Sequence, residues 1–228
     1  MLLALIGQPF PCMTRLLASC LFAALLGNAS ATTLTFEGLG LGDNSAIPQS
    51  YGDNSGTTPN VTVSYRELDG FGGSSSVVYD HLHYWTSGYG NLSQVAWGST
   101  DHNNVSHVAE ISLVASAGWE VMLNSFDLAG WLTNQPGRAI RIYDGDYNEL
   151  TSYTNQTILS SGNHSSFSPG VAANVVHLQW DYPWGVAIDN VSFQQRSTGA
   201  SVPDAGSTWA LLGAAMAGLA AVRNRRSA

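Results

Sequence analysis

The sequence contains no lysine, and eight arginines stand against sixteen acidic residues. Between residues 32 and 201 only four arginines face fifteen acidic residues, which gives this stretch a net charge of −11. A surface of this sign gains nothing from counterion release on a phosphate backbone, so we expect no nucleic-acid partner. Divalent cations, in contrast, would be tolerated or attracted.

Cysteine is almost absent, because Cys12 and Cys20 are its two occurrences. Both lie in a segment that we expect to be removed, so the mature protein would contain no thiol. Disulfide bonds and a cysteine nucleophile are then excluded. The mature chain would have to gain its stability from a packed core.

A sustained helical period is also missing from the body of the chain, in which short apolar runs alternate with Gly, Asn, Asp and Ser. The segments "NVTVSY", "AEISLVA" and "VVHLQWD" place apolar residues at every second position, as in strands with one buried face. Gly occurs 24 times and charged residues make up only 11%. The pattern predicts an all-β fold, a single antiparallel, jelly-roll-like β-sandwich over residues 32–197.

The first 31 residues have the three parts of a secretory signal peptide. Arg15 gives a basic start, Leu16 to Leu26 an apolar centre, and Ala29-Ser30-Ala31 a small-residue cleavage site. We expect cleavage after Ala31 and therefore export of the chain. Met13 gives the more compact signal and is an alternative start.

The last apolar strand contains a break in its alternation. Val186 and Ile188 have one parity, whereas Val191 and Phe193 have the other. A β-bulge near Asp189 would reconcile the two halves. Without a bulge, Asp189 would share the inward face and would need a hydrogen bond, a partner charge or a metal.

The opening "TLTFEGLG" and the closing "AIDNVSF" resemble the first and last strands of jelly-roll carbohydrate-binding modules. In many of those modules a Glu from the first strand and an Asp from the last hold a structural calcium ion. The resemblance implies Glu37 and Asp189 as the corresponding calcium ligands. The alternative is that both are strand-edge residues with backbone partners.

Aromatic residues are the main candidates for ligand contact. Exposed rings could stack on sugar faces, whereas buried rings would only fill a core. Trp119 and Trp180 have the sequence context of core residues. The candidates for carbohydrate contact are Trp85, Tyr89, Tyr182 and Trp184.

Known catalytic motifs are absent: the sequence has no Gly-x-Ser-x-Gly, no His-Glu-x-x-His and no phosphate-binding loop. We therefore predict a non-catalytic protein. Two alternatives stay open. One is a secreted envelope hydrolase, since a glycosidase's two carboxylates meet in space rather than in sequence. The other is a purely structural surface protein.

The C-terminal segment has three parts. A polar linker covers residues 198–208, an uncharged run of 14 residues covers 209–222, and a tail with three arginines covers 223–228. As a helix the apolar run would be about 21 Å long, which is short against a hydrocarbon core of about 30 Å. We expect a short transmembrane helix with its basic end in the cytoplasm.

This tripartite segment resembles the PEP-CTERM class of bacterial sorting signals, in the variant whose signature reads Val-Pro-Asp-Ser-Gly. Val202, Pro203, Asp204 and Gly206 match, while Ala205 replaces the usual Ser. The resemblance implies an exosortase as partner, transient membrane anchoring before processing, and delivery to the cell surface or extracellular matrix. Exopolysaccharide is the further partner that this context implies.

Overall fold

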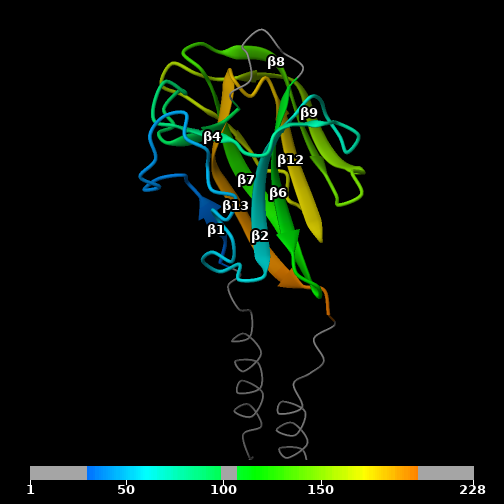
Figure 1. Ribbon diagram of the computed structural model, residues 1–228. Helices are drawn as coiled ribbons and strands as arrows, with labels where there is room; N and C mark the ends of the chain where they lie inside the picture. Colours follow the sequence, from blue (N-terminus) through cyan, green and yellow to red (C-terminus); the bar gives the residue numbers. More distant parts are fainter. Residues whose placement is uncertain (1–29, 99–106, 200–228) are drawn as a thin grey trace, which may run out of the picture. The chain divides into compact units, whose positions relative to one another are not determined.

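The structure is a computed structural model that describes residues 30–98 and 107–199 (Figure 1). Within these residues all regular secondary structure is β-strand, and the strands form two antiparallel sheets. Sheet A contains β1 (Thr32–Leu34), β4 (His83–Trp85), β5 (Val95–Trp97), β7 (Trp119–Gly130), β10 (Ser165–Phe167), β11 (Val171–Ala173) and β13 (Val186–Ser197). Its order is β10-β7-β13-β5-β4, with β1 paired to β13 and β11 to β7.

Sheet B contains β2 (Val61–Leu68), β3 (Val77–Tyr79), β6 (Val108–Ala115), β8 (Gln135–Tyr143), β9 (Glu149–Ile158) and β12 (Val175–Asp181). Its order is β3-β2-β6-β12-β8-β9. In Figure 1 the long strands β2, β6 and β12 of this sheet lie side by side in front of β7 and β13. The predicted all-β sandwich is confirmed.

The main core lies between the sheets and is built by alternation along each strand. In β12, Val176, Leu178 and Trp180 are buried in this core, while His177 and Gln179 take the other parity. The indole N–H of Trp180 donates a hydrogen bond to the Val186 carbonyl at 3.0 Å, which satisfies its one polar atom. The sequence pattern predicted this division of the strand.

The predicted bulge in β13 is present. The pairing of β13 with β7 shifts between Asp189 and Ser192, and Asn190 has a φ of 52°. Asn adopts this left-handed conformation more readily than most residues. The shift reverses the parity of the strand, so Ile188 and Val191 both enter the core.

The processing segments lie largely outside the described residues. These include Ala29, the sorting motif and the expected helix over residues 209–222. Ala31 is described, and β1 begins directly after it at Thr32, while β13 ends at Ser197. In the described ranges, no helix has the length and apolar character needed to cross a membrane.

Candidate functional site

A second apolar cluster lies on the outer face of sheet A. Tyr84, Ala96 and Ile188 point into the main core, so their sequence neighbours on the same strands point the other way. These outward residues join others to form the cluster: Tyr89, Leu92, Val95, Trp97, Ala129 and Ala187, with Trp85, Trp131 and Trp184 packed against it. The sheet is therefore apolar on both faces in this region.

Five rings of this cluster line a small hollow, which we call the aromatic pocket: Trp85, Tyr89, Trp97, Trp131 and Trp184. Its empty volume is about 230 Å³. The Trp85 ring lies edge-on to both Trp97 and Trp131, with centroids 5.5 Å apart in each pair. Tyr89 lies 5.0 Å from Trp131. These contacts hold the rings in one arrangement.

Hydrogen bonds and one glycine fix the pocket walls. The Tyr89 hydroxyl donates to the Trp184 carbonyl at 2.6 Å, and Trp97 Nε1 donates to the Tyr84 carbonyl at 3.4 Å. A Cβ at Gly88 would collide with the Trp131 ring, and Gly88 also has a φ of 88°, so a side chain is excluded there. The Trp85 indole nitrogen is buried and has no hydrogen-bond partner among the described residues.

The structure brings together three of the four residues proposed for carbohydrate contact. Trp85, Tyr89 and Trp184 line the aromatic pocket, but Tyr89 is only 2% exposed, so the expectation of a surface ring was wrong for it. Tyr182 is not among the rings that line the pocket: it packs against the main core, receives the Arg138 guanidinium 4.9 Å from its centroid, and lies 6.4 Å from the Trp184 ring. Tyr182 thus borders the pocket through Trp184 without lining it.

Sequence reasoning missed two pocket residues and misplaced one tryptophan. Trp97 alternates with Ala96, which was a usable signal, since opposite parity to a core residue places a ring on the outer face. Trp131 follows the end of β7 and gave no such signal. Trp180 is in the core as expected, whereas Trp119 is half-buried and belongs to neither cluster.

The outer face of sheet B carries a buried carboxylate, Glu110, within a polar network. Arg66 Nε donates to Glu110 Oε1 at 2.6 Å, Ser112 donates to the same oxygen at 2.8 Å, and Gln179 Nε2 donates to Oε2 at 2.5 Å. Burial alone would raise the pKa of Glu110, but hydrogen bonds from His177, Arg66 and Gln179 lower it to about 2. Glu110 is therefore ionised, and both of its carboxylate oxygens already accept hydrogen bonds from the protein.

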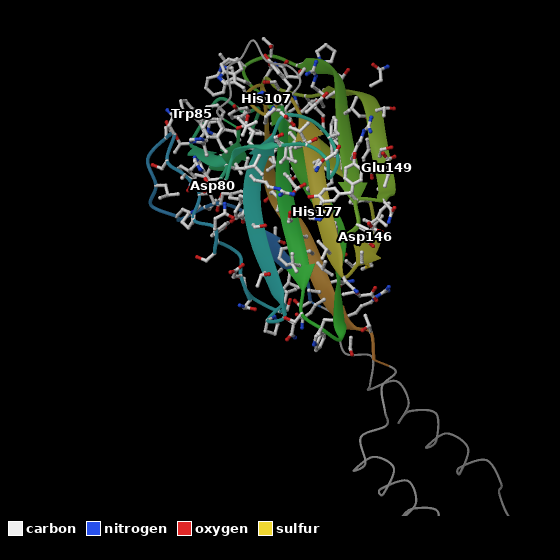
Figure 2. The ribbon with its side chains drawn as sticks, turned by 45° about the vertical axis from the view of Figure 1, so that its right-hand side comes forward. Asp80, Trp85, His107, Asp146, Glu149 and His177 are labelled. Carbon is white, nitrogen blue, oxygen red and sulfur yellow. The ribbon has the colours of Figure 1, made fainter. Side chains whose placement is uncertain are left out.

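Beside this network lies a larger open hollow, which we call the polar groove, with an empty volume of about 850 Å³. Figure 2 labels two of its residues, Asp80 and His177. Asp80 is the single carboxylate among the residues that line the groove, and the aromatic pocket is lined by no carboxylate. Neither of these two hollows in the described structure supplies the carboxylate pair that a glycosidase uses.

The proposed calcium ligands differ in their surroundings. Glu37 is exposed after β1, whereas Asp189 on β13 is 4% exposed and lies opposite Asp127 on β7. Burial raises the pKa of Asp189 to about 7, and the charges of Glu37 and Asp127 add to this, while the Asn190 backbone N–H, 2.7 Å from Oδ1, opposes it.

The described residues contain no group of three or more His, Cys, Asp or Glu side chains placed to hold a metal ion. Glu37 and Asp189 supply carboxylate oxygens, which is the ligand type that calcium prefers. The remaining ligands would have to be backbone carbonyls and water. The residues present thus fit calcium in chemistry, with two side chains only.

Several solved structures are similar to this chain in fold, all at low identity. A CBM35 module from Cellvibrio japonicus Abf62 is 11% identical over 75% of this chain and 99% of its own, with a TM-score of 0.34. A CBM4 module is 13% identical over 67% of this chain and 100% of its own, with a TM-score of 0.30. The Podospora anserina GH26-CBM35 beta-(1,4)-mannanase is 12% identical over 62% of this chain, with a TM-score of 0.33, and the chain spans 29% of it.

No curated protein matches this sequence. A family model does match its C-terminal segment, over residues 201–226, and that model is the VPDSG-CTERM motif. The match covers Val202, Pro203, Asp204 and Gly206, from which the signal was predicted, and also Ala205 in place of the usual Ser. Residues 201–226 are therefore a sorting signal of the VPDSG-CTERM family, the PEP-CTERM-like type that exosortases recognise.

Proposed function

We propose that this is an exported bacterial surface or matrix protein whose β-sandwich binds polysaccharide without catalysis. The C-terminal sorting signal implies that the protein is exported and delivered to the cell surface. The observation that supports carbohydrate binding is the aromatic pocket, where five rings from four parts of the chain converge on one hollow. Pyranose rings present C–H faces that pack on aromatic rings and hydroxyls that need hydrogen-bond partners.

The pocket's size and its polar atoms suggest how a sugar would bind. The aromatic pocket is a small hollow, partly open to solvent and lined by five rings. It suits one sugar unit, such as a chain end or a branch. The buried Trp85 indole N–H would donate to a sugar hydroxyl, and leaving that donor unpaired costs about 1–3 kcal/mol.

Removal of a pocket ring is expected to weaken glycan binding. Trp85→Ala and Trp131→Ala each remove a half-buried ring that touches the other, and loss of an aromatic anchor lowers affinity at least about tenfold. A glycan array identifies the ligand, and calorimetry on the strongest hit measures the change.

The matched control for this experiment is Trp119→Ala, because Trp119 is a half-buried tryptophan outside both aromatic clusters. It should bind as the wild type does. Equal affinity for all three variants and the wild type would remove the pocket from the proposal. Release of shortened sugars from the bound glycan would favour the hydrolase alternative.

We further propose processing by an exosortase after transient anchoring through residues 209–222. Intact-mass measurement of surface-released protein should then show an N-terminus near Thr32 and a C-terminus within the stretch from Val202 to Ser207. Substitution of Pro203 and Gly206 by alanine should leave the chain unprocessed. A released wild-type form that still contains Arg226 would contradict exosortase processing.

We also propose that Glu37 and Asp189 hold a structural calcium ion. Calcium that binds only the folded state raises the melting temperature, and a chelator lowers it. Asp189→Asn should reduce this difference strongly and Glu37→Gln partly, whereas Asp146→Asn, an exposed aspartate on another loop, should leave it unchanged. Identical wild-type melting curves in chelator and in excess calcium would reject the site.

A further inference from the structure

The polar groove lies on the outer face of sheet B and is lined by Gln49, Ser64, Tyr65, Arg66, Val77, Asp80, Ser112, Val114 and His177. Val63, Ile111 and Leu113 on the same strands point into the main core, so the groove residues of opposite parity point away from it. The aromatic pocket occupies the outer face of sheet A. The two hollows therefore lie on opposite outer faces of the sandwich.

Two rows of residues, paired across three strands, lie at the groove and beside it. Arg66, Glu110 and Gln179 face one another in register across β2, β6 and β12. Ser64, Ser112 and His177 form the next row. A buried row of charged and amide groups is costly unless every member is hydrogen-bonded. Here the bonds to Glu110 satisfy that condition and hold Arg66 in place.

The orientation of His177 is set by the same network. Ser112 donates its hydroxyl hydrogen to Glu110 and so accepts from His177 Nδ1, which lies 2.8 Å away. In the neutral ring Nε2 is then the hydrogen-bond acceptor. The ring is also stacked on Tyr147, with centroids 4.3 Å apart and planes at 6°. His177 is thereby presented to the groove in one pose.

The loop from Asp69 to Ser76 closes one side of this network. The Gly72 backbone N–H donates to Gln179 Oε1 at 2.9 Å. A Cβ at Gly73 would overlap the Tyr147 ring, so a glycine is required for that approach. The Phe71 ring lies 4.9 Å from the Arg141 guanidinium. Contacts at three successive residues therefore hold this loop against the network beside the groove.

The chemistry of the lining residues suits an uncharged, hydroxyl-rich chain. Arg66 and Asp80 contribute opposite charges to the groove. The serines, Gln49 and His177 add groups that can both donate and accept, as sugar hydroxyls do. Val77 and Val114 are 52% and 38% exposed and offer apolar surface for C–H faces.

We propose that the polar groove is a second binding site, for neutral polysaccharide, and that the domain cross-links chains by binding one on each outer face. The cross-linking rests on the proposed function of the aromatic pocket. The two sites open on faces that point away from each other, so one straight segment of a chain cannot occupy both. Two-site binding therefore joins different chains or distant parts of one chain and raises avidity on a dense polymer.

The test uses purified full-length protein with four soluble neutral polymers (hydroxyethylcellulose, xylan, mannan and dextran) and with polygalacturonate as an acidic comparator. Ser64→Phe fills the groove from an exposed position, and Thr154→Phe places the same ring on an exposed position of β9 outside the groove. Trp131→Ala removes one wall of the aromatic pocket. Light scattering measures cross-linking, and calorimetry with short oligosaccharides measures the number of sites.

Wild type and Thr154→Phe should cross-link a neutral polymer and bind two oligosaccharides each. Ser64→Phe and Trp131→Ala should each keep one site and lose cross-linking, and the double variant should bind none. Unchanged cross-linking by Ser64→Phe would overturn the groove proposal and leave the pocket standing. Full loss of binding in Ser64→Phe with none in Trp131→Ala would instead overturn the pocket. Tighter binding to polygalacturonate would overturn the neutral ligand.

Discussion

Replacement of Glu110 by alanine is expected to lower the free energy of unfolding by about 3–5 kcal/mol, because it removes one partner from a buried ion pair. Arg66 would lose its carboxylate, and Gln179 and Ser112 would lose their acceptor. Part of the Arg66 side chain reaches solvent, which favours the lower end of this range. Denaturant unfolding followed by tryptophan fluorescence measures the change.

The matched control is Glu120→Ala, because Glu120 also pairs with an arginine, Arg196, whose side chain is exposed, while Glu120 itself is only half-buried. Exposed pairs contribute about 0–1 kcal/mol. Glu110→Gln, which keeps the shape and one acceptor oxygen, should fall between the two. A Glu110→Ala variant no less stable than Glu120→Ala would show that the network contributes little to folding.

The same carboxylate makes the free energy of unfolding depend on pH in the acid range. The pKa of Glu110 is lowered to about 2 in the folded state from its ordinary 4.5. Its contribution is therefore complete above pH 4.5 and is lost as the pH falls toward 2, by about 3 kcal/mol in total. In Glu110→Gln the free energy of unfolding should change less with pH between 4.5 and 2.

The fold could be predicted where a strand has one buried face. β12 shows this clearly, since Val176, Leu178 and Trp180 mark the core side by alternation alone. The reversal at Asp189 was predictable for the same reason, because a change of parity within a strand requires a bulge.

Alternation could not show that the opposite faces are buried as well. Glu110 and Gln179 are 0% exposed although they lie on the outer face of sheet B. They are covered by residues remote in the sequence, such as Tyr147 and Gly72, and a strand pattern carries no signal of such a cover. The polar groove and its network therefore emerged only from the structure.

The sequence predicted that aromatic residues would form the binding site, but it could not show which of them meet in the pocket. Its rings come from four separate parts of the chain, and only the pairing of β4, β5, β7 and β13 decides which of them meet. Tyr182 and Trp184 are two residues apart, yet one ring packs on the main core and the other lines the pocket. Tyr182 has a φ of 53°, so the alternation rule for strands does not apply at that turn.

Replacement of Asp189 by asparagine is expected to stabilise the calcium-free protein at pH 8. Burial raises the pKa of Asp189 to about 7 from its ordinary 3.8. A raised carboxyl pKa means that the folded state binds the proton more tightly, so wild-type stability falls as the pH rises from about 4 to about 7. The penalty above pH 7 is at most about 4 kcal/mol. Asn keeps the oxygen that accepts the Asn190 N–H and carries no charge.

Unfolding curves in chelator from pH 4 to pH 8 measure this effect, with Asp146→Asn as the control at an exposed position. The gain from Asp189→Asn should be near zero at pH 4 and largest at pH 8. Added calcium should stabilise the wild type, because a bound cation offsets the buried charge of Asp189, and it should leave the variant unaffected. The difference in stability between the two proteins should therefore shrink. A variant that is less stable than the wild type at pH 8 in chelator would contradict this prediction. It would mean that the folded protein stabilises the ionised Asp189 carboxylate, in spite of its burial and of the nearby charges of Asp127 and Glu37.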